Sequence, residues 1–161
     1  MYKLILIMLM MVVWMYMHAL QTDEEMATAA LFQGKHAVNR AAHAAAQQLD
    51  RAALADGRAH IDEPAAIREA ARYLQTNLQL DEAGMPLPGA YLQDRVEVLV
   101  CDVVNDDRTF PFVYRNAAYN YEVTLRKPGV VMIVKLVYPS VFSVMAPIEW
   151  EIKGTAELVD N

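Results

Sequence analysis

The sequence has little cysteine and little positive charge, and each shortage excludes a class of protein. Its single cysteine, Cys101, allows no intramolecular disulfide, so the chain is not a disulfide-stabilised secreted scaffold. Its 14 Lys and Arg residues against 20 Asp and Glu residues give a net charge of −6, whereas proteins that bind nucleic acid concentrate positive charge. A length of 161 residues suits one domain. We therefore expect a protein with one core that does not bind nucleic acid.

Hydrophobic residues gather near the start of the chain, in a segment that has neither proline nor charge. Residues 4–17 read LILIMLMMVVWMYM, and residues 18–20 extend this uncharged segment. As a helix it spans about 26 Å, close to the ~30 Å hydrocarbon core of a bilayer. Lys3 precedes it and three acidic residues follow at 23–25, which predicts a retained anchor with the N-terminus in the cytoplasm and the rest exported. The alternative is a cleaved signal peptide, for which Met17-His18-Ala19 is a poor cleavage site because a large residue stands first.

A helical pattern continues beyond this anchor. Apolar or small residues recur at spacings of three and four from residue 27 to residue 52, and no proline occurs between residues 2 and 55. We therefore predict one continuous helix over 2–55, about 80 Å long. The rest of the chain is too small to cover such a helix, so its first half must be buried in lipid or against copies of itself.

A second, shorter helix is predicted to fold back on the first. Asp62 suits an N-cap, and Pro64 suits the first turn of a helix. The inner side of this helix is marked by Ala66, Ala70, Tyr73, Leu74 and Leu78. Both helices are rich in alanine, which favours close helix packing over a deep ligand pocket.

Strands are predicted after the turn-forming residues 81–89. The strand-like runs are 95–104, 110–114, 119–127, 130–138 and 148–158. The first of them is predicted as a central strand, and the last alternates apolar and polar residues as a half-buried closing strand does. The third and fourth flank Pro128-Gly129 and predict a hairpin, whereas the proline in the second restricts that run to an edge. The predicted fold class is α+β, with a long N-terminal helix that is first hydrophobic and then amphipathic, a short second helix, and a C-terminal antiparallel sheet of three or four strands.

Residues with catalytic or ligating side chains are present, but their spacing does not suit a site. His36 and His43 lie about 10 Å apart along a helix axis, too far to share one zinc ion. Cys101 has no second cysteine and lies in a strand pattern, which favours a buried, inert thiol. The remaining candidates, Ser140, Ser143, His60 and the run 105–107, lack a nucleophile elbow, a placed triad and the spaced ligands of a calcium loop. We predict no catalytic, cofactor or metal site.

The order of a charge-flanked hydrophobic N-terminus, an amphipathic helix and an antiparallel sheet resembles the type IV pilin superfamily of filament subunits. The segments that carry the likeness are residues 4–20, KHAVNRAAHAAAQQLDRAAL at 35–54, AAIREAARYLQTN at 65–77, and VVMIVKLVYP at 130–139 with the closing strand. Within that superfamily the sequence is most similar to TadE/TadG-like pseudopilins of tight-adherence pili. The resemblance implies an exported subunit, held by its first helix, that polymerises or primes a filament assembled by a membrane platform and an ATPase.

Two features depart from the pattern of type IV pilins. Ile5 stands where those proteins usually carry a glutamate, and no basic leader precedes Met1. Either the chain is already processed, or it belongs to a group that handles its N-terminus differently.

Without a glutamate at position 5, the positive charge of Lys3 has no acidic residue near it in the sequence with which to pair. In a bundle of helices the ammonium of Lys3 would enter a low-dielectric core, where an unpaired charge costs several kcal/mol. We hypothesise that Asp23, Glu24 or Glu25 of a neighbouring subunit, displaced axially by about 30 Å, pairs with it. The alternative is that these three acids form a solvated flank at the membrane edge.

These observations favour a structural subunit, a major or minor pilin, of an extracellular filament on the cell surface. Residues 1–22 would form the anchor and then the filament core, and 23–161 the exported head. The predicted assembly residues are Leu4, Ile5, Leu6, Ile7, Leu9, Val12, Val13, Trp14, Tyr16 and Leu20. The resemblance implies that its partners are copies of itself or other pilins and the inner-membrane assembly platform, and the hydrophobic segment predicts that the membrane is its partner before assembly. A membrane-anchored extracytoplasmic scaffold or binding module is the alternative, and an anchored enzyme is the least favoured function.

Overall fold

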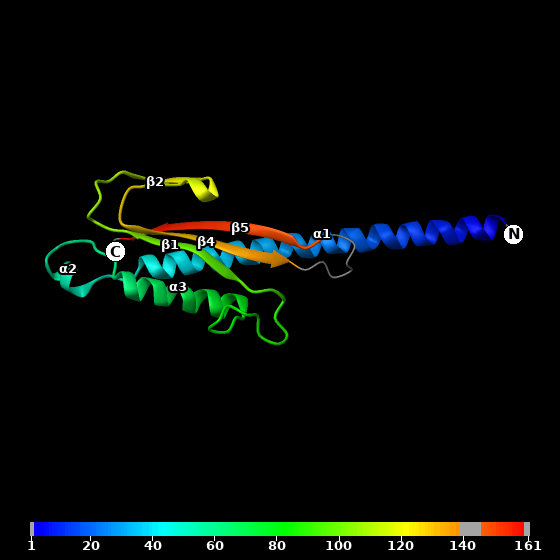
Figure 1. Cartoon of the computed structure of the whole chain (residues 1–161), viewed down its shortest axis with the longest axis horizontal. Coiled ribbons are helices and arrows are strands. Elements are labelled where there is room, and N and C mark those ends of the chain that lie inside the picture. Colours follow the sequence, from blue (N-terminus) through cyan, green and yellow to red (C-terminus); the bar gives the residue numbers. More distant parts are fainter. Residues whose placement is uncertain (1, 139–145, 160–161) are drawn as a thin grey trace.

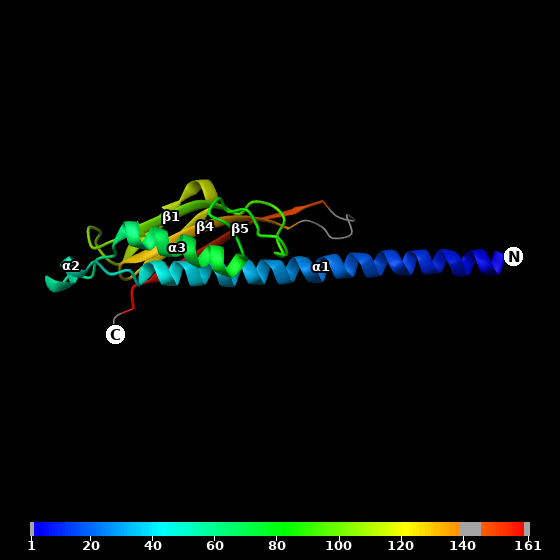
Figure 2. The ribbon, with the colours of Figure 1, turned by 90° about the horizontal axis from the view of Figure 1, so that it is seen from below.

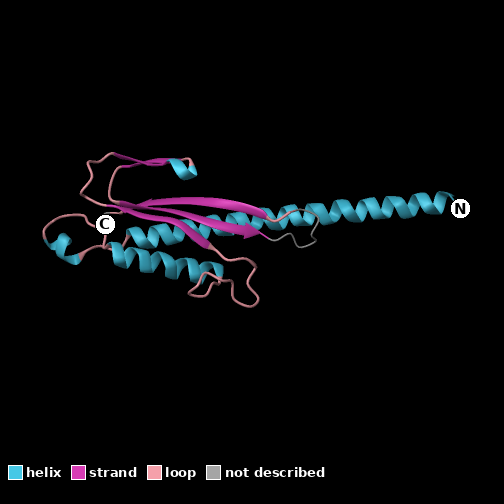
Figure 3. Ribbon diagram, in the orientation of Figure 1, coloured by secondary structure: helices cyan, strands magenta, loops and turns pink. Residues whose placement is uncertain are grey.

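The protein is a long helical rod that carries a compact head along its second half (Figure 1). The computed structural model describes residues 2–138 and 146–159. Helix α1, Tyr2–Ala46, runs the full length of the rod, and its first half protrudes from the head. The head contains helices α2 (Arg51–Ala55) and α3 (Glu63–Leu78) and two antiparallel sheets (Figure 3). The predicted α+β class is confirmed.

Helix α1 ends at Ala46, so the prediction of one helix over 2–55 is wrong. Beyond this end, Leu49 forms an isolated β-bridge with Ile61. Two backbone hydrogen bonds flank the bridge, from Asp50 N to the His60 carbonyl at 2.9 Å and from Asp62 N to the Gln48 carbonyl at 2.7 Å. These bonds turn the chain out of the helix because residues 48–50 are held in extended pairing. Helix α2 then starts anew, with the Asp50 side chain accepting a hydrogen bond from Ala52 N.

Helix α3 matches the predicted second helix and lies beside the second half of α1 (Figure 2). The carboxylate of Asp62 accepts a hydrogen bond from Ala65 N at 3.0 Å, which confirms the predicted N-cap. Four of the five predicted inner residues are buried, and Tyr73 is half-buried; the buried ones are Ala66, Ala70, Leu74 and Leu78. Small alanines on both helices therefore form the contact, as the composition predicts.

The larger sheet has three antiparallel strands in the order β1 (Glu97–Val104), β4 (Gly129–Tyr138), β5 (Ile148–Glu157). The expectation that residues 95–104 form a central strand is wrong, because β1 lies at an edge and β4 is central. The physical reason is that β4 is apolar on both faces. Val130, Met132 and Val134 belong to the core shared with α1 and α3, whereas Val131 faces a second core with Val104 and Leu125.

Strands β2 (Phe112–Asn116) and β3 (Tyr121–Leu125) form a separate two-stranded sheet, so the predicted hairpin around Pro128-Gly129 is wrong. The chain turns instead through η1 (Ala117–Tyr119) and Asn120, whose φ of 45° lies in the left-handed region that asparagine tolerates. The small sheet lies over the face of the large sheet opposite α1. The Tyr121 hydroxyl is 2.7 Å from Thr155 Oγ1, and Arg126 N donates to Glu157 Oε1 at 2.6 Å.

Two glycines allow α1 to approach the sheet closely. A Cβ at Gly154 would lie 2.8 Å from Val38 Cγ1, and a Cβ at Gly34 would lie 2.6 Å from Ile152 Cδ1. A Cβ at Gly154 would have to displace the Val38 side chain of α1, and a Cβ at Gly34 would have to displace the ends of the Leu136 and Ile152 side chains. Close contact between α1 and the sheet therefore depends on the absence of these two side chains.

Candidate assembly surface

The first half of α1 exposes apolar side chains on every side. The predicted assembly residues from Leu4 to Tyr16 are all exposed, with fractions between 67% for Leu4 and 55% for Tyr16. Leu20, the last of the predicted set, is half-buried where the head begins. This helix is long and apolar enough to cross a membrane. Because exposing an apolar surface of this extent to water is energetically unfavourable, we expect lipid or protein to surround the segment.

A stack of aromatic rings fixes the point where α1 enters the head. Tyr138, at the end of β4, is buried between Tyr91 and Trp150, with ring centroids 5.9 Å and 6.2 Å away. The Tyr91 hydroxyl donates a hydrogen bond to the backbone carbonyl of Met26. Ala27 and Ala30 complete this small core. Helix α1 therefore packs against the head from about residue 26 onward, whereas its residues 2–18 are exposed.

An apolar groove of about 590 Å³ lies at this junction, between α1 and the start of β5. The α1 residues that line it are Met17, Leu20, Gln21, Glu24, Ala27, Thr28 and Leu31, and β5 adds Ile148 and Trp150. Their spacing of three and four places the α1 residues on one helix face. The groove is continuous with the exposed apolar surface because Met17 belongs to both.

The four charged residues predicted to pair between subunits differ in their exposure to solvent. Lys3, Glu24 and Glu25 are exposed, whereas Asp23 is completely buried at 0% exposure. Among the three acids, only Glu24 lines the groove. The structure therefore leaves Glu24 and Glu25 available to a neighbouring molecule and encloses Asp23 within the subunit.

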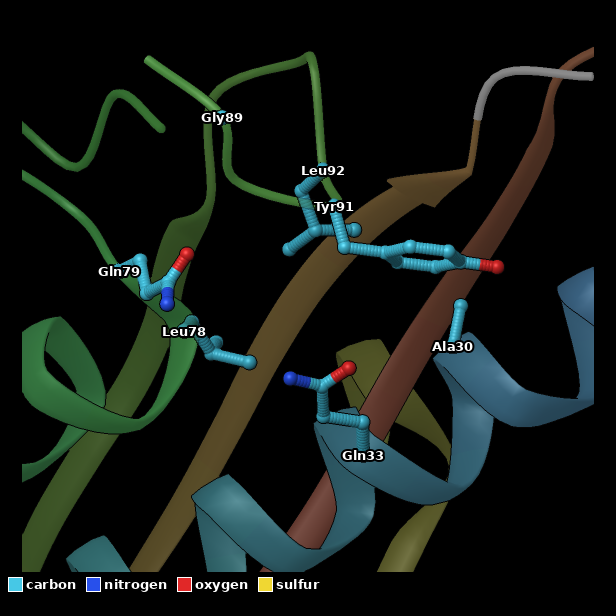
Figure 4. Close-up of a pocket in the computed structure, with 7 residues that line it drawn as sticks. All are labelled: Ala30, Gln33, Leu78, Gln79, Gly89, Tyr91 and Leu92. Carbon is cyan, nitrogen blue, oxygen red and sulfur yellow. The ribbon is translucent and has the colours of Figure 1, made fainter. Parts of the chain in front are cut away.

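A second, smaller pocket of about 280 Å³ lies between α1, the end of α3 and the loop before β1 (Figure 4). The Tyr91 ring and the Gln33 and Gln79 carboxamides border it, together with Ala30, Leu78, Gly89 and Leu92. The described residues that line it include no acid, histidine, cysteine or lysine, the side chains that serve as general acids and bases near neutral pH.

The polar cluster that sequence reasoning missed joins the loop before α3 to the turn after β1. His60 Nδ1 lies 2.6 Å from Asp106 Oδ1, and Arg58 Nη1 lies 3.6 Å from Asp106 Oδ2. The Asn105 carboxamide accepts from Ile61 N at 2.8 Å and donates to the Ile61 carbonyl at 3.0 Å. These residues are more than 40 positions apart in the chain, so no local pattern indicates the contact. The cluster fastens the two loops together.

The pH dependence of this cluster follows from Asp106. A hydrogen bond from His60, with the nearby charge of Arg58, lowers the pKa of Asp106 below its ordinary value of 3.8. A lowered folded-state pKa contributes stability above the unfolded value and loses it as the pH falls through the folded value. We expect Asp106→Asn to lower the urea midpoint of unfolding at pH 6 and to have less effect at pH 3. Equal effects at the two pH values would contradict this assignment.

The remaining candidates from the sequence are His36, His43, Cys101, Ser140 and Ser143. His36 and His43 are exposed on α1. Burial raises the pKa of the Cys101 thiol, which lowers its thiolate fraction and hence its reactivity. Ser140 and Ser143 lie outside the described residues. Within residues 2–138 and 146–159, no three His, Cys, Asp or Glu side chains are grouped to hold a metal ion.

Comparisons with protein-family models, with curated proteins and with solved structures find no match to this chain.

Proposed function

We propose that the protein is a structural subunit, a major or minor pilin, of an extracellular filament of the type IV pilus kind. The observation that carries the proposal is that every apolar residue of α1 from Tyr2 to Met17 is exposed. Before assembly, the membrane covers this segment, with the N-terminus in the cytoplasm and the head outside. After transfer by an inner-membrane assembly platform, the same segment of other copies or of other pilins covers it.

The form of the head supports this proposal. It holds only the second half of α1 and leaves the apolar half as a separate, straight extension (Figure 2). Such an extension can exchange lipid for protein without any change in the head, because the core of the head does not include it. Polymerisation then requires no unfolding of the subunit.

A single-pass anchored scaffold or binding module is the second candidate function. It is favoured by the length of α1, which suffices to cross a bilayer without any protein neighbour. The two functions differ in the assembly that they require. A filament needs many copies in contact, whereas an anchored module works as a monomer or small oligomer.

Imaging of material sheared from cells distinguishes the two functions. We expect negative-stain micrographs to show filaments, and mass spectrometry of the same material to identify this chain and its N-terminus. Recovery of the chain only from the membrane fraction would contradict the filament and support the anchored module. Full-length chain that is monodisperse in buffer without detergent would contradict both, because neither allows the apolar rod to remain in water.

A further inference from the structure

The groove at the junction continues as a stripe along α1. Beyond Leu31 on the same side of the helix lie Phe32, which is 55% exposed, and Lys35, which is also exposed. The head covers other sides of α1 in this region but leaves these residues in water. Because each of Glu24, Thr28, Leu31, Phe32 and Lys35 lies three or four positions from another member of the set, they form one face of the helix.

We propose that this face and the wall formed by β5 receive the free half of α1 from a second copy of the chain, with Lys3 of that copy beside Glu24. This inference rests on the proposed function and specifies its geometry. The offset between the two helices is then 21 residues, or about 32 Å at 1.5 Å per residue. The helices are parallel because every copy leaves the same membrane in the same orientation.

With this offset, the side chains of the two helices face each other over three turns. Ile7 of the second copy lies beside Thr28, Met10 and Met11 beside Leu31 and Phe32, and Trp14 beside Lys35. On the second copy, Lys3, Ile7, Met10, Met11 and Trp14 again follow the spacing of one helix face. Apolar side chains thus meet the apolar part of the stripe, and the Trp14 ring meets an ammonium group that it can bind by a cation–π contact.

Electrostatics selects Glu24 among the three acids. An apolar helix laid in the groove removes water from the Glu24 carboxylate, and an unpaired charge there is costly. The Lys3 ammonium supplies the compensating charge. Asp23 is buried within its own subunit, and Glu25 lies about 100° around the helix from Glu24 and does not line the groove.

Cysteine cross-linking within filaments tests the offset. In a Cys101→Ser background, a chain carrying Ile7→Cys and Thr28→Cys cannot cross-link internally, because the two positions are about 32 Å apart on one straight helix. We expect mild oxidation of its filaments to give a ladder of covalent multimers. The matched control pairs Ile7→Cys with Gln21→Cys, on the same face but about 10 Å short of the proposed alignment, and gives no ladder. Filaments that cross-link through the control pair, or that lack the 7–28 ladder, would overturn this inference and leave the filament in place.

A charge exchange tests the ion pair independently. We expect Lys3→Glu to cause loss of filaments, Lys3→Glu with Glu24→Lys to restore them, and Lys3→Glu with Glu25→Lys to leave them lost. Corrected membrane orientation cannot explain the rescue, because Glu24→Lys adds positive charge on the exported side. The pairing would be overturned if Glu24→Lys and Glu25→Lys restored filaments equally, or if neither restored them. Absence of filaments from the unmodified chain would instead overturn the proposed function.

Discussion

Leu9→Asp should abolish filament formation and leave the head folded. Leu9 is exposed in the subunit, in the middle of the apolar half of α1, and contributes nothing to the core of the head. In the proposed filament, other apolar helices would surround this position. A lone carboxylate there has neither water nor a partner, and its burial costs several kcal/mol in every copy. We therefore expect no filaments in sheared material by electron microscopy.

The control for this variant separates assembly from export and folding. A carboxylate at the centre of a membrane helix also costs about 2.5–3.5 kcal/mol during insertion, so the variant must first be found in the membrane fraction with a protease-accessible head. Leu9→Met keeps an apolar side chain of similar volume and should assemble normally. Normal filaments from the aspartate variant would contradict burial of this half of α1 in the filament.

Leu136→Ala should have the largest effect on the stability of the head. Leu136 is 1% exposed, and its side chain lies over the Gly34 position where α1 meets the sheet. Truncation of a fully buried leucine removes apolar contacts and leaves a cavity, which typically costs about 2–5 kcal/mol. We expect the free energy of unfolding, measured by urea titration of the detergent-solubilised chain, to fall by this amount.

Leu54→Ala is the matched control, because it makes the same truncation at a position that is 53% exposed on α2. It should change the free energy of unfolding by less than about 0.5 kcal/mol. If the two variants unfold at the same urea concentration, the contact between β4 and α1 is not part of the cooperative core.

The sequence predicts those elements whose signals are local. The start of α3 follows from Asp62 and Pro64, which act on the backbone within one turn. Strand β5 follows from its alternation, since Ile152 and Ala156 are buried while Glu149 and Glu151 face water. The exposed half of α1 follows from its uncharged composition. In each case the residues that determine the element lie within it or directly before it.

The predictions that are wrong depend on contacts between distant parts of the chain. The end of α1 depends on the bridge between Leu49 and Ile61, which the periodicity of residues 27–52 does not reveal. The centre of the sheet is β4 because a second sheet covers its outer face, and that sheet forms through Asn120 and not through Pro128-Gly129.

In the candidate site, too, the sequence predicts the local features and not the contacts between distant residues. Its apolar residues could be predicted from the sequence, because they form one run. The burial of Asp23, the wall of the groove at Ile148 and Trp150, and the contact between His60 and Asp106 could not, because each depends on residues brought together by folding.

The alignment of β4 and β5 along α1 has a mechanical consequence for the proposed filament under tension. Both strands run roughly along the helix axis in both views of the ribbon (Figures 1 and 2). A pull on the rod relative to the head is therefore directed along the contact and must slide many side chains at once, including those interlocked at Gly34 and Gly154. Loading of this kind resists rupture better than peeling, in which contacts break one after another, so the head should stay on its rod when the fibre is stretched.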